Sequence, residues 1–380
     1  MIDAILILGG HIQALGLARQ VKAKGLHVSV VTNDRCAVAR LSRSVDTTRF
    51  YQTDDELLSL LTTMGNKHTL LFPTSDDYID FIVAHRQTLE SAYTVALPDS
   101  KVVALFANKR NSDRFAVEND VPHPTTWCCD SLDDLDATIS QVSFPCVLKP
   151  AVMYTFHKQF GKKAFLCGSA EVLKERVTTI VSQGFPIGLL MMQEFLSGGA
   201  KTLYSYGCFA VDGEPVVSIQ ANRIRQNPMD FGNSTTFAVT CHIDEIEQSA
   251  RRILARTHYT GMAEIEFMHH NGAYKFLEIN TRAWKWHTLS DGCGFSFVGA
   301  WIDYLNGKAT SQPPYVEMAW VERLTDVAVV TKELLKGRIR LREVLHTYHR
   351  QKVSAVWQWR DPLPALMYVL LSPILYVKRH

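Results

Sequence analysis

The sequence predicts a mixed α/β and α+β protein with several domains, and three observations support this. Short β-rich runs alternate with helical stretches over the first 105 residues, which is typical of a doubly wound parallel sheet. From about residue 187, longer strand-like runs follow one another, as in an α+β unit. The chain has 380 residues, which is too long for one compact core.

The totals indicate an ordinary globular chain. Hydrophobic residues make up 47% and charged residues 21% of the sequence, and the formal net charge is only +2. A net charge this close to zero creates no strong positive potential that would attract a nucleic acid, so no nucleic-acid partner is expected. The eight cysteines form no C-x-x-C pair, which favours reduced thiols in a cytoplasmic protein. No apolar run reaches the roughly 20 residues of a membrane span.

Residues 1–105 are predicted to form the parallel domain. The runs "AILIL", "HVSVVT", "TLLFPT" and "YTVALP" are its strands, with helical stretches between them. The glycine turn "GGHIQALG" after the first strand invites a dinucleotide-binding interpretation. It does not match G-x-G-x-x-G, and Asp34 is the nearest acid after the second strand, so a nicotinamide site is disfavoured.

Three further units follow. Residues 106–186 contain the helix around "ANKRNSDRFAVEND" and the buried strand "FPCVLKP", which ends in Lys149 and Pro150. Residues 187–310 form a larger α+β unit, whose strands include "LLMMQEFL", "EPVVSIQANRI" and "MAEIEFM". Residues 311–380 are predicted to be a helical extension after the linker "SQPPY".

The segment "MAEIEFMHHNGAYKFLEIN" carries a hairpin signal at Asn271-Gly272. A two-residue turn there would place apolar Ile265 opposite acidic Glu278. We therefore predict an odd-length loop that begins at His270, because register follows the buried face. The core face then carries Ile265, Phe267, Leu277 and Ile279.

The opposite face of this hairpin is predicted to be acidic. Carboxylates held this close together repel one another, so they need a cation or solvent to remain ionised. Oxygen ligands from two glutamates and an asparagine suit Mg²⁺, which completes its shell with waters and substrate phosphates. A sheet face that is simply wet is the alternative. The residues on this face are Glu264, Glu266, Glu278, Asn280 and Arg282.

Six segments in a fixed order extend the pattern over residues 1 to about 310. They are "FPTSDD", "NKRNSDRFAVENDVPHP", "FPCVLKP", "QEFLSGG", "NRIRQNPMDFG" and the acidic hairpin that ends in "FLEINTRAW". Together they resemble the ATP-grasp superfamily, in particular its carboxylate–amine ligases, which include D-aspartate ligase-like enzymes. The resemblance implies a Rossmann-like (pre-ATP-grasp) N-terminal domain and two α+β lobes that sandwich ATP, followed here by the helical C-terminal extension.

The resemblance also implies which residues hold the nucleotide. Lys109 and Lys149 correspond to the two lysines that touch the ATP phosphates, and Lys163, of the double lysine that ends the next loop, joins them. Residues 151–162 correspond to the loop that closes over the phosphates. The hinge residues that would meet the adenine are Gln193 and the backbone of Glu194, Phe195 and Leu196.

Metal and substrate residues are implied in the same way. Glu266, Glu278 and Asn280 match the ligands of Mg²⁺ (or Mn²⁺). Arg282 matches the arginine that faces the reacting carboxylate, and either Arg223 or Arg225 would lie nearby.

The activity implied is an ATP-dependent carbon–nitrogen ligase that acts through an acyl phosphate. It would join a small-molecule carboxylate to an amine, with an amino acid or peptide-like substrate, and release ADP and phosphate. Two alternatives remain on the same fold. One is a carboxylase that activates bicarbonate, and the other is a non-catalytic ATP-binding regulatory protein.

Four features depart from the family pattern. Asn108 stands where an Asp commonly precedes the lysine, and the loop before the double lysine has a single glycine, Gly161. Thr281 replaces the usual proline. The bulky run "WKWH" after Arg282 predicts a distinctive acceptor pocket.

The last twenty residues, 361–380, are unusually apolar. The 16-residue stretch Pro362–Val377 contains three prolines, so it cannot cross a bilayer as one regular helix. Packing on the body of the protein is one interpretation. A homodimer contact and a peripheral membrane contact are the alternatives, and Lys378 and Arg379 favour the membrane.

Overall fold

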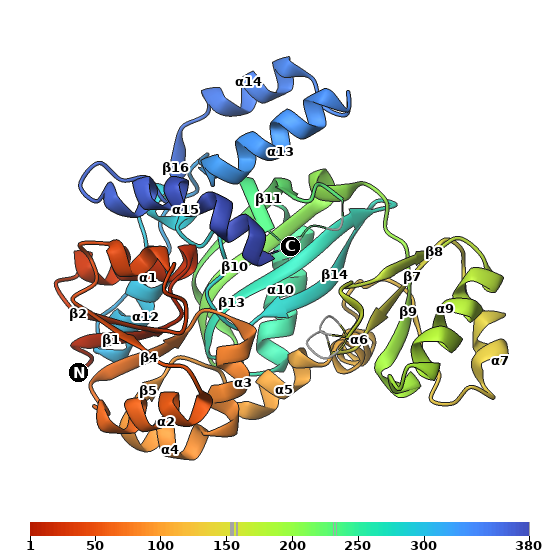
Figure 1. Cartoon of the computed structure of the whole chain (residues 1–380), viewed down its shortest axis with the longest axis horizontal. Helices are drawn as coiled ribbons and strands as arrows, with labels where there is room; N and C mark the ends of the chain where they lie inside the picture. The colour runs from red at the N-terminus through yellow and green to blue at the C-terminus, as the bar shows by residue number, and fades with distance from the viewer. Residues whose placement is uncertain (153–155, 157–158, 231, 233, 380) are drawn as a thin grey trace.

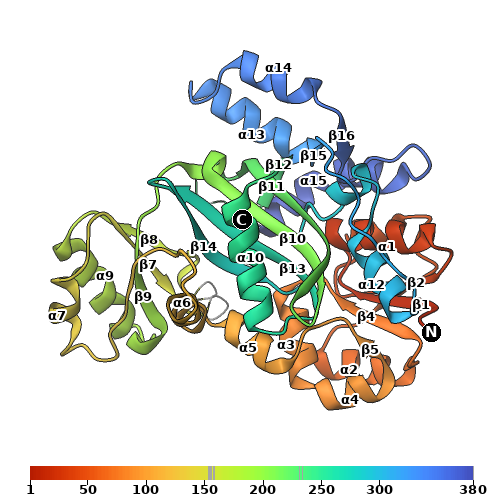
Figure 2. The same cartoon turned by 180° about the vertical axis from the view of Figure 1, so that it is seen from behind.

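The computed structural model describes residues 1–152, 156, 159–230, 232 and 234–379, with side chains described as far as residue 372. Three sheets lie side by side, each with its own helices (Figures 1 and 2). The N-terminal domain and a small lobe flank a large central sheet, and two helices of the C-terminal region cap one end of that sheet. The candidate site lies on the central sheet.

The N-terminal domain has five parallel strands in the order β3-β2-β1-β4-β5. This confirms the predicted parallel sheet and adds β3, whose sequence TTRF has no apolar alternation and no buried residue. Its strands are Ala4–Leu8, His27–Thr32, Thr47–Phe50, Thr69–Pro73 and Thr94–Val95. Its helices are α1 (Ile12–Ala23), α2 (Asp54–Thr63), α3 (Asp76–Ala84) and α4 (Arg86–Ala92).

The small lobe is an antiparallel sheet in the order β6-β9-β7-β8. Its strands are β6 (Thr126–Trp127), β7 (Cys146–Pro150), β8 (Phe165–Cys167) and β9 (Leu190–Glu194). Because β9 pairs with both β6 and β7, the structure moves the lobe boundary from the predicted residue 187 to beyond Glu194. Helices α7 (Leu135–Ile139) and α9 (Ala170–Ser182) contribute to the core of this lobe, whereas α5 (Ser100–Ala107) and α6 (Lys109–Glu118) contribute to the core of the central sheet.

The central sheet has seven strands in the order β14-β13-β10-β11-β12-β15-β16. The first five are β10 (Leu203–Val211), β11 (Glu214–Asn227), β12 (Ser234–Cys241), β13 (Gly261–His270) and β14 (Ala273–Asn280). Along β10, Tyr206 and Cys208 join the core beneath α10 (Asp244–Arg256), whereas Phe209 joins the core beneath α12 (Phe297–Leu305). Both faces of this sheet are therefore covered over part of their area.

The C-terminal region corrects the prediction of a purely helical extension. Strands β15 (Ala319–Val321) and β16 (Lys352–Ser354) complete the central sheet, since the three residues of β15 are fully buried and pair with β12. The helices are α13 (Arg323–Leu335), α14 (Leu341–His349) and α15 (Leu363–Arg379). Within the described part of the chain, no helix combines the length and apolar content needed to cross a membrane.

Candidate active site

The acidic hairpin is formed by β13 and β14, and the acids do share one face. Glu266 lies opposite Glu278, and Glu264 lies opposite Asn280. The loop, however, is the two-residue turn Asn271-Gly272, both with positive φ, so the predicted odd-length loop is wrong. A bulge between Glu266 and the next residue instead brings the acidic side chains of the two strands onto the same face.

The bulge also changes the position of Leu277, which was predicted to lie on the core face. Phe276 pairs with Phe267 and is buried in that core, while Leu277 is the extra residue of β14 and is half-buried. Leu277 lines a small pocket together with Lys109, Lys149 and Gln193. The bulge therefore brings an apolar side chain to the predicted nucleotide residues.

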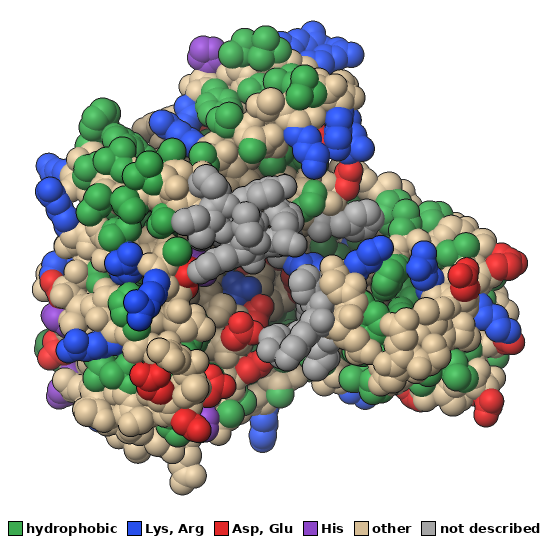
Figure 3. All heavy atoms as spheres, in the orientation of Figure 1, with side chains coloured by type: hydrophobic (Ala, Val, Ile, Leu, Met, Phe, Trp, Pro, Cys, Tyr) green, Lys and Arg blue, Asp and Glu red, His purple; other side chains and the backbone are tan. Residues whose placement is uncertain are grey.

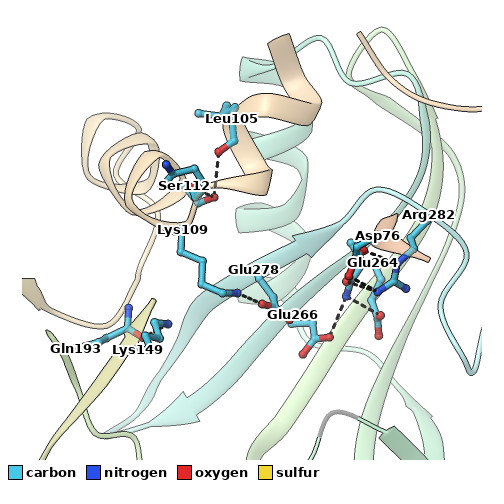
Figure 4. A network of polar contacts seen from close by, with 12 residues as sticks. Asp76, Leu105, Lys109, Ser112, Lys149, Gln193, Glu264, Glu266, Glu278 and Arg282 are labelled. Carbon is cyan, nitrogen blue, oxygen red and sulfur yellow. Dashed lines mark hydrogen bonds and ion pairs between the residues drawn. The ribbon is translucent and has the colours of Figure 1, made fainter. Parts of the chain in front are cut away.

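A dense hydrogen-bond network fixes the acidic face (Figure 4). The Asn280 Nδ2 amide donates to Glu264 Oε2 and to Glu266 Oε1, at 3.1 Å each. The Trp286 indole N–H donates to Glu264 Oε1 at 2.7 Å. The guanidinium of Arg223, from β11, lies 2.5 Å from Glu266 Oε2. Three separate elements therefore hold the carboxylates in place.

Two predicted lysines face this network from the small-lobe side. Lys109, the first residue of α6, forms an ion pair with Glu278. Lys149, from β7, donates to Gln193 Oε1 at 2.6 Å. Lys163 is half-buried; burial lowers its pKa, and Glu278 and Lys109 are the charges that act on it most strongly. The structure thus gathers all three predicted lysines near Glu278.

Burial and neighbouring charges shift the pKa values of several groups in the site away from their usual range. Lys109 lowers the pKa of Glu278 to about 2, whereas burial and the charge of Glu266 raise the pKa of Glu264 to about 7. Burial and the charge of Lys109 lower the pKa of Lys149 to about 7. A polyanion beside Lys149 and a cation beside Glu264 would each restore the ordinary ionisation of these groups.

Of the three predicted arginines, two lie in the site. Arg282 makes a bidentate ion pair with Asp76 at the start of α3, and Arg223 contacts Glu266. Arg225 is held elsewhere, because its Nε and Nη2 each donate to Asp326 of α13 at 2.9 Å. A register shift of β11 on either side of Arg225 accompanies this separation.

The predicted hinge follows β9. Gln193 donates from Nε2 to Thr126 Oγ1 at 3.0 Å, and the Glu194 N–H donates to the Thr125 carbonyl at 2.8 Å. That N–H is therefore unavailable to an adenine ring. Beyond the strand, Phe195 is half-buried and Leu196 is buried. Within the predicted closing loop 151–162, residues 153–155, 157 and 158 lie outside the described part of the chain.

The bulky residues after Arg282 are packed inside the protein, and the acceptor pocket predicted from them stays a prediction. Trp284 and Trp286 are both buried, and Trp284 packs on Phe297. A Cβ at Gly207 would lie 2.3 Å from the Trp284 ring, which explains the glycine at that position of β10. Sequence reasoning missed Asp76 as a partner of Arg282, although "FPTSDD" was among the matched segments.

No three His, Cys, Asp or Glu side chains form a ready-made metal group anywhere in the described ranges. The predicted set contains only two carboxylates and one amide, so further oxygen ligands are needed for Mg²⁺. Phosphate oxygens of a nucleotide are suitable donors. Glu278 already holds a cationic partner in Lys109, which fits a position that attracts positive charge.

Comparison with known proteins identifies the fold. No family model matches, and no curated protein matches by sequence. The biotin carboxylase domain of Hydrogenobacter thermophilus 2-oxoglutarate carboxylase, solved with MgADP and bicarbonate, aligns at 16% identity and a TM-score of 0.65. The alignment covers 82% of this chain and 72% of that one.

Two other structures agree. Biotin carboxylase from Campylobacter jejuni aligns at 15% identity with a TM-score of 0.65, covering 81% of this chain and 72% of that one. N5-carboxyaminoimidazole ribonucleotide synthetase from Staphylococcus aureus, solved with ADP, aligns at 14% identity with a TM-score of 0.64, covering 82% and 79%. The chain therefore has the ATP-grasp fold that the sequence predicted.

Proposed function

We propose that this protein is an ATP-dependent ligase that joins a carboxylate to an amine through an acyl phosphate. One observation carries the proposal. Cationic, carboxylate and amide groups from the small lobe, the central sheet and the N-terminal domain converge on one site, where Lys109 meets Glu278 and Arg282 meets Asp76 (Figure 4). Phosphoryl transfer requires this combination of positioning and charge neutralisation.

The proposed nucleotide site has two parts. Lys109, Lys149 and Lys163 would neutralise the polyphosphate, because the sequence has no P-loop to do so. Leu277 and Met191 line the pocket beside Lys149 and would contact the adenine ring. Two of the structural neighbours were solved with ADP, which supports nucleotide binding by this fold.

Mg²⁺ fits the acidic side of the site. Glu266, Glu278 and Asn280 would hold it, since all three offer oxygen donors on one face. When bound, the ion would neutralise charge on the β- and γ-phosphates. Lys109 would then leave Glu278 and bind phosphate oxygens. The charge of Glu278 would be neutralised by the ion instead of the lysine.

The first chemical step would consume ATP. A carboxylate oxygen of the substrate attacks the γ-phosphorus, the bond from that phosphorus to the β-phosphate oxygen breaks, and ADP leaves. Arg282 would hold the carboxylate in place of Asp76, which its bidentate geometry suits. The product is an acyl phosphate.

The second step would form the amide. The amine nitrogen attacks the acyl carbon, phosphate leaves, and one proton is released. Arg223, with a buried Nε that has no hydrogen-bond partner among the described residues, would stabilise the oxyanion together with Arg282. The acyl phosphate must be protected from water, which is the role proposed for the loop 151–162.

A second function is favoured by a specific finding. One neighbour was solved with bicarbonate as well as MgADP, so bicarbonate is the alternative carboxylate-type substrate. Its activation would give a carboxyphosphate and then a carboxylated amine. ADP release that depends on bicarbonate would distinguish this reaction from ligation of an organic carboxylate.

The test is a screen for ADP release. Carboxylates, including bicarbonate, are combined with amines, and products are identified by mass spectrometry, with the Glu278→Gln variant as the blank. We expect ADP release that requires both substrates and Mg²⁺, with an amide product. Absence of ATP binding by the wild-type protein, or equal turnover by the blank, would overturn the proposal.

A further inference from the structure

Helix α15 carries an exposed apolar face. Leu363, Leu366 and Leu370 recur at helical spacing, with Val369 beside them, so they lie on one side of the helix. Leu370 is 69% exposed. Trp359, four residues before the helix, is 86% exposed. Figure 3 shows hydrophobic side chains gathered over the part of the surface where α15 begins in Figure 1.

The other face of the same helix is docked on the protein. Tyr368 is buried in the core shared by the N-terminal domain and the central sheet, and Leu371 packs against that core. The segment just before the helix is fixed by Asp361, which pairs with buried Arg19 at 2.9 Å. A surface helix held in this way normally presents polar residues outward. The apolar outer face of α15 therefore needs another explanation.

The charged residues of this segment are basic, apart from the buried Asp361. From Pro362 to His380 the sequence contains no acidic residue, and it includes Lys378 and Arg379. Arg360 and Arg43 are exposed nearby, and neither forms an ion pair within the described part of the chain. Asp361 is buried and fully engaged by Arg19, Ser42 and the Arg43 N–H, so it offsets none of this charge.

We propose that the outer face of α15, with Trp359, binds the surface of an anionic membrane. Leucine side chains would enter the acyl boundary, the indole would lie at the headgroup level, and the arginines would meet lipid phosphates. The helix has 17 residues, and its first half is docked on the protein through Ala365, Tyr368 and Leu371, so it would lie on the bilayer and not cross it. The proposal is independent of the ligase activity.

A second copy of the chain is a poorer occupant of this face. In a twofold dimer each patch meets itself, so Arg360 and Arg43 of both copies would be brought together. Like charges placed across an interface disfavour association. A lipid surface rich in phosphatidylserine instead offers the opposite charge over a wide area.

The experiment is flotation of the full chain with phosphatidylcholine vesicles, with and without about one third phosphatidylserine. We expect flotation only with phosphatidylserine, reduced by high salt. The double variant Leu366→Gln/Leu370→Gln should lose about tenfold or more of the partition coefficient, since two apolar side chains no longer enter the lipid. The matched control is Leu335→Gln on α13, which is 85% exposed and should float as wild type.

Circular dichroism and thermal melting of each variant establish that it is folded before flotation is compared. Wild-type protein that fails to float, or a folded double variant that floats equally well, would overturn the proposal. Light scattering without lipid provides the remaining test. A wild-type dimer that the double variant abolishes would assign this face to a second copy and also overturn it.

Discussion

Asp76 and Arg282 stand 206 positions apart in the sequence and meet as a bidentate ion pair, with Nε to Oδ1 at 2.6 Å and Nη2 to Oδ2 at 3.2 Å. The pair joins the first turn of α3 to the end of the acidic hairpin. Asp76 supplies a carboxylate to the arginine that is proposed to hold the substrate carboxylate. The side chain therefore occupies the position that a substrate would take.

Removing the charge of Asp76 should strengthen substrate binding. In Asp76→Asn the guanidinium of Arg282 no longer has to leave a carboxylate, and a pair with one exposed partner is worth roughly 0.2–1 kcal/mol. We expect the KM for the carboxylate to fall by up to about fivefold, with kcat nearly unchanged. Asp77→Asn, one residue away and without contact to Arg282, is the control. A higher KM in Asp76→Asn would show that Asp76 helps to bind the substrate.

Thermal unfolding should test the proposed metal site directly. MgATP at about a hundred times its Kd adds about 2.7 kcal/mol to the free energy of unfolding, which raises Tm by several degrees. In Glu278→Gln most of the Mg²⁺-dependent part of this shift should be lost, because one of three proposed ligands is gone and Lys109 loses its partner. Scanning fluorimetry with and without a chelator measures it. An unchanged Mg²⁺-dependent shift in the variant contradicts the assignment of Glu278.

Nucleotide binding should depend on pH through Lys149. Burial and Lys109 lower its pKa to about 7 in the free protein, and a bound polyphosphate would raise it again. Between these two pKa values the complex holds one more proton than the free protein, so the Kd for ATP should rise with pH above 7, by at most about tenfold per unit. Titration calorimetry in buffers of different ionisation enthalpy should show proton uptake at pH 8.

The matched variant for this experiment is Lys149→Met. It should bind ATP more weakly at pH 6 but lose the proton uptake, since no titrating group remains at that position. Proton uptake that persists in Lys149→Met would assign the coupling to another group of the site.

The hairpin shows how far sequence reasoning reaches. Alternation along β13 and β14 predicted that Glu266 and Glu278 share a face, because burial of Ile265 and Ile279 fixes the register. The alternation did not predict which feature brings the acidic residues of both strands onto one face, since a bulge and an odd-length loop satisfy the same pattern. Only the structure shows that Leu277 is the bulged residue.

Long-range partners were the other limit. Arg223 and Arg225 were equivalent in the sequence, and the choice between them depends on Asp326, which lies a hundred residues later on α13. Likewise β15 was hidden because three apolar residues carry no period that separates a strand from a helix. The local sequence pattern predicted most helices and strands, whereas contacts between residues far apart in the sequence determine which elements lie next to one another.

One buried ion pair fixes the segment that precedes α15 to the N-terminal domain, and its removal should be costly. Arg19 and Asp361 have side chains only 7% and 6% exposed, and Asp361 also accepts from Ser42 Oγ at 2.6 Å. In Asp361→Ala the guanidinium remains buried without its counterion, which typically costs about 3–5 kcal/mol. Asp136→Ala is the control, because its pair with Lys174 is more than half exposed and should be worth less than about 1 kcal/mol. Urea unfolding of both variants measures the difference, and equal midpoints would show that α15 is held mainly by apolar packing around Tyr368.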